Sequence, residues 1–184
     1  MTAARGWPDD WDERKAGAEC PLCTSLGDGE NDHTVAVAEL DWAEVRLERR
    51  SRLPGYCIAV WRHRHVAEPT ELAADEADGY WRDVTALARA IEAEFRPVKV
   101  NLLTLGNWVP HLHTHFVTFW GVTLDGWDEA LPSIAALARD LIASGELMHL
   151  AAEATPLAEV ATALWDRLGA CVPDVERIAE VQPT

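Results

Sequence analysis

Five short strand-like segments alternate with polar and turn residues along the first two thirds of the chain. They lie at residues 34–40, 44–50, 56–61, 98–105 and 113–120. In the second segment, Val45 and Leu47 alternate with charged residues, and this period of two is typical of a half-buried strand. The pattern therefore predicts a sheet assembled from several short strands.

A longer segment, residues 71–95, has the helical period instead. Its apolar residues recur three and four positions apart and form a single stripe, which consists of Leu72, Tyr80, Val84, Leu87, Ile91 and Phe95. Thr70 is the expected N-cap, and Pro97 lies just past the predicted end. This segment is predicted to be a long helix with one buried face.

Two further amphipathic helices are predicted in the last third of the chain. One is expected between Pro132 and Gly145, and the other between Pro156 and Gly169. Residues 1–32 have neither period and are expected to be irregular. The order of strands, helix, strands and helices indicates an α+β fold with a mainly antiparallel sheet.

Composition places the chain among ordinary globular proteins. Its 184 residues are 48% hydrophobic and 26% charged, as is usual for such proteins. No apolar segment approaches the roughly 20 residues that a membrane-spanning helix needs, and the N-terminus lacks the apolar stretch of a secretory signal. We therefore expect a cytoplasmic protein with no membrane partner, whose four cysteines stay reduced.

The net charge of −15 argues against a nucleic acid polymer as partner, because phosphate backbones require a basic surface. The charge is uneven, however. Residues 46–64 contain six Arg and one Glu, which gives a local charge of +5. This run can hold a small anionic ligand, or it can be the solvated edge of a strand, and the sequence leaves both interpretations open.

Three alternating histidines are the most informative motif. In His111-Leu-His113-Thr-His115 the side chains of the three histidines share one face if the segment is extended. Such a row can ligate zinc with an open position for water, or it can form a nucleophilic site in which one imidazole attacks. A cupin-like metal barrel would need a downstream Glu and repeated Gly spacing, which do not follow His115, so the nucleophile interpretation is favoured.

The segment His111-Leu-His-Thr-His-Phe-Val117 resembles the His-φ-His-φ-His-φ-φ signature of the histidine triad (HIT) superfamily, in which φ is apolar. Upstream, residues 53–66 (LPGYCIAVWRHRHV) resemble the Pro-Gly-His-X-Leu-Val-X-Pro-Lys-Arg-His segment of the same family. The resemblance covers about residues 20–120. The short Gly-Asn-Trp-Val-Pro loop before the triad is similar to a branch described as diadenosine polyphosphate hydrolases, although Asn107 stands in place of the commoner Gln.

This resemblance implies a mechanism. His113 would attack the α-phosphorus of a nucleotide and form a nucleotidyl-imidazole intermediate, while its second ring nitrogen donates to a backbone carbonyl. His115 would lie near the phosphate oxygens and the leaving group, with both a catalytic and a substrate-binding role. Glu48, at the ribose hydroxyls, together with Asn101 and Asn107, completes the expected substrate-binding set.

The pair Cys20-Pro-Leu-Cys23 has the spacing of a tetrahedral zinc corner, which needs two more ligands. Resemblance to the zinc-bearing branches of the family, including galactose-1-phosphate uridylyltransferase, implies that His65 and His111 supply them and that the zinc is structural. A redox motif and a pair of buried thiols are the alternatives, and the redox motif lacks its usual strand and helix context.

We therefore expect a catalytic HIT-like domain at residues 1–124, a helical extension at 125–184 and a homodimer, as in most of the family. The predicted function is hydrolysis or transfer at a nucleotide α-phosphate, with dinucleoside polyphosphates as substrates. The alternatives are a nucleoside phosphoramidate hydrolase, a dinucleotide phosphorylase, or a module that only binds nucleotides.

Overall fold

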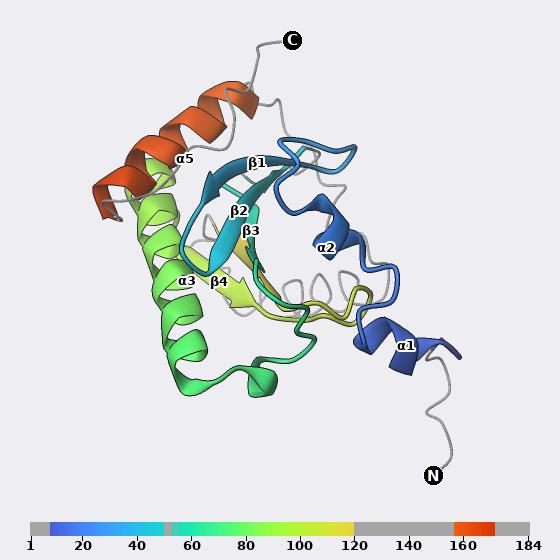
Figure 1. Ribbon diagram of the computed structural model, residues 1–184. Coiled ribbons are helices and arrows are strands. Elements are labelled where there is room, and N and C mark those ends of the chain that lie inside the picture. The colour runs from blue at the N-terminus through green and yellow to red at the C-terminus, as the bar shows by residue number, and fades with distance from the viewer. Residues whose placement is uncertain (1–7, 50–52, 54, 120–156, 172–184) are drawn as a thin grey trace, which may run out of the picture.

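The computed structural model describes residues 8–49, 53, 55–119 and 157–171 (Figure 1). The helix expected between Pro132 and Gly145 lies outside the described residues, as does most of the expected extension at 125–184. None of the helices in the described part of the chain is long and apolar enough to cross a membrane.

A five-stranded sheet forms the centre of the described molecule. Its strands are β1 (Thr34–Glu39), β2 (Ala43–Glu48), β3 (Cys57–Trp61), β4 (Lys99–Leu103) and β5 (His113–Phe119). They lie in the order β1-β2-β3-β5-β4, and every neighbouring pair is antiparallel. The predicted α+β class with a mainly antiparallel sheet is thus confirmed, and each predicted strand is present within two residues of its expected bounds.

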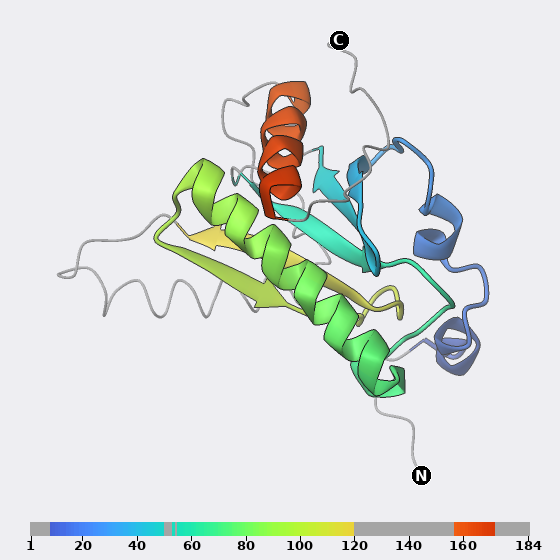
Figure 2. The same cartoon turned by 60° about the vertical axis from the view of Figure 1, so that its left-hand side comes forward.

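The long helix α3 (Ala74–Phe95) crosses one face of the sheet (Figure 2). The predicted stripe is the buried one: Tyr80, Val84, Leu87 and Ile91 are inaccessible to solvent. The predicted N-cap, Thr70, is wrong, because it lies in the short 3-10 helix η1 (Pro69–Glu71). The helix begins after Ala73, whose N–H donates to the Glu76 carboxylate at 2.8 Å, so a side chain inside the first turn satisfies the free backbone donor.

Helix α5 (Leu157–Cys171) packs on α3 and β1 (Figure 2). Its side chains Ala161, Leu164 and Leu168 belong to the same hydrophobic core as the buried face of α3. The helix continues two residues beyond Gly169, the expected stop. A glycine inside a helix costs only about 1 kcal/mol, which the packing of the preceding turn offsets.

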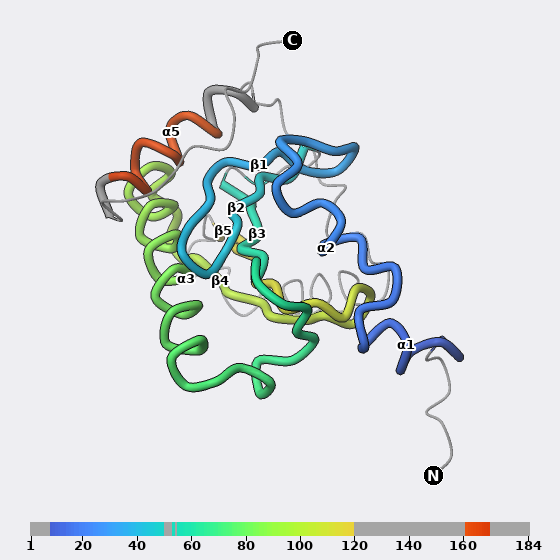
Figure 3. The backbone as a smooth tube through the Cα atoms, in the orientation of Figure 1, coloured from blue at the N-terminus to red at the C-terminus, as the bar shows by residue number. Residues whose placement is uncertain are grey.

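The N-terminal segment lies across the sheet from α3 (Figures 1 and 3). Where irregular chain was expected, it contains two five-residue helices, α1 (Trp11–Lys15) and α2 (Pro21–Ser25). Proline at the first position of α2 and the Cys20 Sγ, which accepts the Cys23 N–H at 3.5 Å, both favour a helix start. Helices this short contain too few residues to show a period in the sequence.

A buried ion pair fastens this segment to the sheet. Arg46 donates to the carboxylate of Glu44 and, through the same nitrogen, to the carbonyls of Ser25 and Asp28 at 3.0 and 3.1 Å. The other carboxylate oxygen of Glu44 accepts the N–H of Gly27 at 2.8 Å. The loop after α2 is therefore held on β2 by charged side chains that are removed from solvent.

Candidate active site and metal centre

Strand register determines which face of the sheet carries the histidines. Thr114 is paired with Ala59 and turns toward α3, where its hydroxyl lies 2.9 Å from that of Tyr80. His113 and His115 therefore point to the opposite face, paired with Val60 and Ile58. The helix packs on one side of the sheet and the two histidines face the side of the N-terminal segment.

The ring of His113 is buried and oriented by a backbone carbonyl. Its side chain is 8% exposed, and its Nδ1 lies 2.5 Å from the carbonyl oxygen of His111. A carbonyl can only accept, so Nδ1 carries the proton and Nε2 keeps its lone pair. Burial lowers the pKa of His113, so the ring is neutral at physiological pH. The expected donation from its second ring nitrogen to a backbone carbonyl is confirmed.

His115 lies beside His113, with 4.8 Å between the ring centroids. Its Nδ1 is 2.9 Å from the hydroxyl oxygen of Tyr56. Burial, and next the neighbouring His113, lowers the pKa of His115 to about 3, so this ring is also neutral. The sequence did not single out Tyr56, although it stands where the family's Pro-Gly-His segment has its histidine.

The four predicted metal ligands come together. One ligand atom from each of Cys20, Cys23, His65 and His111 lies within 4.8 Å of the other three, and this cluster can hold a metal ion. The Cys23 Sγ is 3.3 Å from the Nδ1 atoms of both His65 and His111. Burial, followed by the effect of Cys20, raises the pKa of Cys23 to about 11, so a bound cation would displace a proton from this thiol.

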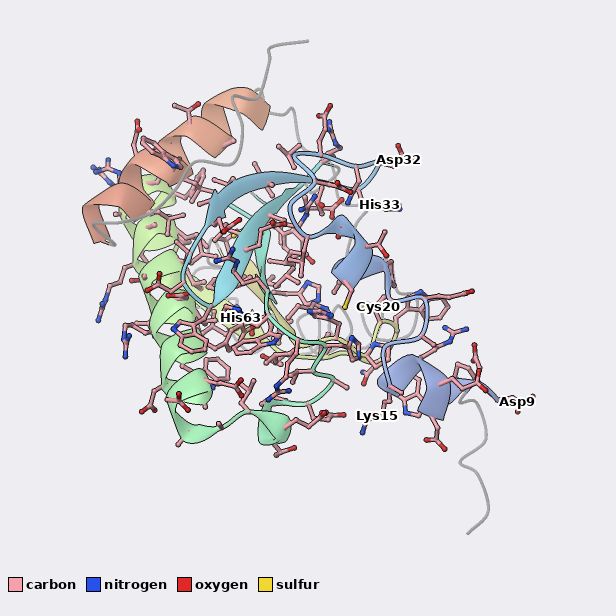
Figure 4. All side chains as sticks on the ribbon, in the orientation of Figure 1. Asp9, Lys15, Cys20, Asp32, His33 and His63 are labelled. Carbon is pink, nitrogen blue, oxygen red and sulfur yellow. The ribbon has the colours of Figure 1, made fainter. Side chains whose placement is uncertain are left out.

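Both imidazoles of the cluster are oriented by backbone carbonyls. His111 Nε2 donates to the Trp61 carbonyl at 2.8 Å, and His65 Nε2 donates to the Lys15 carbonyl at 3.2 Å. Each ring therefore presents the lone pair of Nδ1 to the thiols, as metal-binding histidines do. Lys15 and Cys20, both labelled in Figure 4, place this arrangement between the N-terminal segment and the strands. Two sulfur and two nitrogen donors fit a tetrahedral zinc site.

Residues 29–119 match the HIT domain family. This segment is a HIT domain. The fold agrees with solved structures of histidine triad proteins, of which one from Bradyrhizobium japonicum is 20% identical with a TM-score of 0.56, and the match covers 74% of this chain and 92% of that chain. A zinc-bound histidine triad family protein from Mycobacterium smegmatis is 15% identical with a TM-score of 0.53, covering 82% and 94%.

A histidine triad nucleotide-binding protein from Sulfolobus tokodaii, described as hypothetical, is 14% identical with a TM-score of 0.52, covering 84% of this chain and 93% of that chain. At these identities the likeness shows the fold. The comparison with curated proteins found no match.

The remaining predicted site residues lie at three separate places in the fold. Glu48 is buried on β2, on the same face as the two histidines, and its negative charge raises the pKa of Tyr56. Asn101 lies on β4, the neighbour of β5 on the side away from β3, and its amide donates to the Val117 carbonyl at 3.4 Å. Asn107 is exposed in the loop before the triad. Their roles toward a substrate stay predictions.

The four arginines of the basic run that the structure describes do not form a free cationic surface. Each of them pairs with a glutamate, as Arg46–Glu44, Arg49–Glu30, Arg62–Glu39 and Arg64–Glu76. All four glutamates lie outside the run, at positions 30, 39 and 44 before it and at position 76 after it. Four of the six arginines of the run are therefore paired with acidic residues from outside it.

Proposed function

We propose that this HIT domain is a nucleotide hydrolase or nucleotidyltransferase that acts at the α-phosphate through a covalent nucleotidyl-His113 intermediate. The hydrogen bond from His113 Nδ1 to the His111 carbonyl carries the proposal, because it leaves the Nε2 lone pair free on a neutral ring. The reaction is then divided into two displacements: His113 first takes the nucleotidyl group, and water or another acceptor removes it in the second step. His115 serves the phosphate oxygens and the leaving group, and Asn107 helps to hold the phosphate. Glu48 serves the ribose hydroxyls, and Asn101 completes the substrate-binding set.

Dinucleoside polyphosphates are the substrates that we propose first. The short loop from Gly106 to Pro110 supports this choice through its similarity to the diadenosine polyphosphate hydrolase branch. Phosphoramidate hydrolysis and dinucleotide phosphorolysis are the second candidate, because the same intermediate serves amine leaving groups and phosphate as acceptor.

The test combines a substrate panel with a variant of the nucleophile. Dinucleoside polyphosphates, nucleoside phosphoramidates and sugar nucleotides are assayed for release of nucleoside monophosphate, and acid-quenched enzyme is examined by mass spectrometry for an adduct on His113. His113→Ala is expected to lower turnover below about one-thousandth while nucleotide affinity stays within about tenfold.

His33→Ala is the matched control, because His33 is an exposed histidine just before β1 (labelled in Figure 4). It is expected to keep wild-type turnover. A His113→Ala protein that retains more than about a few per cent of turnover contradicts the nucleophile assignment. Wild-type protein that binds nucleotides and releases no monophosphate from any of them is instead the non-catalytic module.

We propose that the metal is zinc and that it is structural, held by Cys20, Cys23, His65 and His111. Zinc bound by four protein ligands stabilises the fold and leaves no open position for water. Elemental analysis of protein purified without chelator or added metal is expected to find near one zinc per chain. A protein without zinc, or with zinc that survives removal of both thiols in a Cys20→Ser/Cys23→Ser variant, contradicts this assignment.

We also propose that the chain is a cytoplasmic homodimer. Cys20, Cys23 and Cys57 form no disulfide among the described residues, as expected in a reducing compartment. In the described sheet β4 is an outermost strand, and Val98 and Leu102 beside its edge are 71% and 43% exposed. An edge with apolar side chains is a surface that a second copy can cover. Light scattering after size-exclusion chromatography measures the mass, and a monomer would contradict the proposal.

A further inference from the structure

Tyr56 makes a contact that the proposed mechanism has not used. The tyrosine directly precedes β3, its side chain is 2% exposed, and its hydroxyl oxygen is 2.9 Å from His115 Nδ1. Among the described residues, His115 is the hydrogen-bond partner that the structure gives this hydroxyl. The two residues are 59 positions apart and meet because β3 pairs with β5.

Chemistry determines the direction of this hydrogen bond. Burial raises the pKa of Tyr56, and the negative charge of Glu48 raises it further, so the phenol keeps its proton. His115 is neutral and has one ring proton to place. A phenol O–H is a stronger acid than the N–H of a neutral imidazole, and an imidazole nitrogen is a stronger base than a phenol oxygen. The Tyr56 O–H therefore donates to Nδ1, and the ring proton of His115 lies on Nε2.

We propose that Tyr56 is a positioning residue that fixes His115 as a neutral imidazole with its N–H on Nε2, and that the site consequently selects nucleotides whose leaving group departs as an anion. The first half of this proposal stands on the Tyr56–His115 geometry alone. The second half rests on the proposed function, because it requires that His113 displaces a leaving group from phosphorus.

The displacement can be written with all protons assigned. The lone pair of His113 Nε2 forms a bond to the α-phosphorus, the bond from phosphorus to the bridging oxygen breaks, and that oxygen keeps the electron pair. His113 retains its Nδ1 proton and becomes an imidazolium that donates to the His111 carbonyl. His115 donates a hydrogen bond from Nε2 to the departing oxygen and keeps the proton, because its transfer would require an imidazolate or an ionised Tyr56 beside Glu48.

This arrangement distinguishes the two substrate classes that the proposed function left open. A terminal phosphate has a second pKa of about 6, so a nucleoside polyphosphate leaves as a stable anion at neutral pH. An amine must take up a proton as its bond to phosphorus breaks, and a His115 that retains its proton does not supply one. Dinucleoside polyphosphates are thus favoured over nucleoside phosphoramidates.

The tautomer is measured directly in the ligand-free protein. Nitrogen-15 NMR of the histidine rings is expected to show His115 with a protonated Nε2 and an accepting Nδ1. Tyr56→Phe removes only the hydroxyl and is expected to give a mixture of tautomers. Tyr80→Phe is the matched control, since it removes another buried hydroxyl, one that extends from α3 to the sheet and contacts Thr114 beside His115. This control is expected to keep the wild-type tautomer.

Wild-type protein with the His115 proton on Nδ1, or an unchanged tautomer in Tyr56→Phe, overturns the assignment. Neither measurement depends on turnover, so each tests Tyr56 even if the proposed function is wrong. A merely structural role for the tyrosine would lower stability in both phenylalanine variants and leave both sets of ring nitrogen shifts in place.

Kinetics test the selection of the leaving group. Wild-type kcat/KM is expected to be at least about 100-fold higher for a dinucleoside polyphosphate than for a phosphoramidate of the same nucleoside. In Tyr56→Phe, kcat for the polyphosphate is expected to fall about tenfold with little change in KM. The ratio of kcat/KM for the polyphosphate to that for the phosphoramidate is expected to be smaller than in the wild type. Equal or faster cleavage of the phosphoramidate by the wild type overturns the selection. If neither substrate is cleaved while His115 carries its proton on Nε2, the proposed function and the selection fail and the role of Tyr56 stands.

Discussion

Gly17 lies directly against the imidazole ring of His65. A Cβ at residue 17 would come within 2.9 Å of the His65 Cγ and 3.2 Å of its Nδ1, and the backbone φ of Gly17 is +92°. Side chains other than glycine are strained at this φ and would also displace a ring of the metal cluster. The glycine between α1 and α2 therefore sets how closely the N-terminal segment approaches His65.

Gly17→Ala is expected to weaken metal binding. The added methyl group has to push the His65 ring away from Cys23, so we expect the variant to lose zinc at about a tenfold lower chelator concentration than the wild type. Gly27→Ala is the matched control, because Gly27 has a φ of +81° with nothing within 4 Å of an added Cβ. Equal zinc retention in the two variants would contradict the role of Gly17.

Arg46→Met is expected to destabilise the protein strongly. It leaves the Glu44 carboxylate buried without its charged partner, which typically costs about 3–5 kcal/mol. The double variant Glu44→Gln/Arg46→Met removes both charges and is expected to be more stable than the single variant. Urea unfolding measures these two variants and the single variant Glu44→Gln. A double variant that is as unstable as the sum of the two single variants would show that the pair does not act as a unit.

Leu164→Ala is expected to cost about 2–5 kcal/mol of stability without changing the chemical step. Leu164 is inaccessible to solvent and joins α5 to the common core, on the face of the sheet opposite His113. Asp166→Ala, at an exposed position on the same helix, is the control. Thermal unfolding and single-turnover rates are the measurements. If Leu164→Ala stays folded but loses its single-turnover reaction, α5 must contribute to the active site and the prediction is wrong.

Asp83→Asn is expected to change the pH dependence of stability. The Asp83 carboxylate accepts the backbone N–H groups of Trp42 and Ala43 at 2.8 and 3.1 Å, and burial raises its pKa. The folded state thus binds this proton more tightly than the unfolded chain, whose carboxyl titrates near 3.9. The contribution of Asp83 to wild-type stability therefore falls as pH rises from about 4 through the folded pKa.

An asparagine keeps an accepting oxygen for both N–H groups and does not titrate. The stability of Asp83→Asn relative to the wild type should consequently be greater at pH 7 than at pH 4, as measured by urea unfolding at each pH. Asp32→Asn, at an exposed position, should show no such trend. A relative stability of Asp83→Asn that is unchanged or lower at pH 7 would contradict the direction given by burial.

Periodicity predicted the elements that are long enough to repeat. The alternation at Val45 and Leu47 correctly identified the face of β2 that α3 covers. The stripe through Tyr80 and Leu87 is the buried side of that helix. Helices α1 and α2 were missed because five residues do not complete two turns. The start of α3 was misplaced because Thr70 was expected to cap the helix. The side chain of Glu76 instead accepts the backbone N–H of Ala73, and the helix begins there.

The site was predicted only where a motif holds its residues close together. His113 and His115 are neighbours in a strand, so alternation placed them on one face. Cys23 and His111 are 88 positions apart, and only resemblance to zinc-bearing relatives joined them before the structure did. The contact of Tyr56 with His115 depends on the register of β3 against β5, which no local pattern encodes.

The pairing of the arginines with glutamates has a consequence for how a phosphate is held. With the described cations of residues 46–64 already neutralised, the groups proposed to hold the phosphate are neutral: imidazole N–H groups and the amide of Asn107. Such donors act over the length of a hydrogen bond, so few counterions are released when a nucleotide binds. Ionic strength should then affect binding chiefly by screening the negative charge of the protein as a whole, and added salt should speed the approach of an anionic ligand.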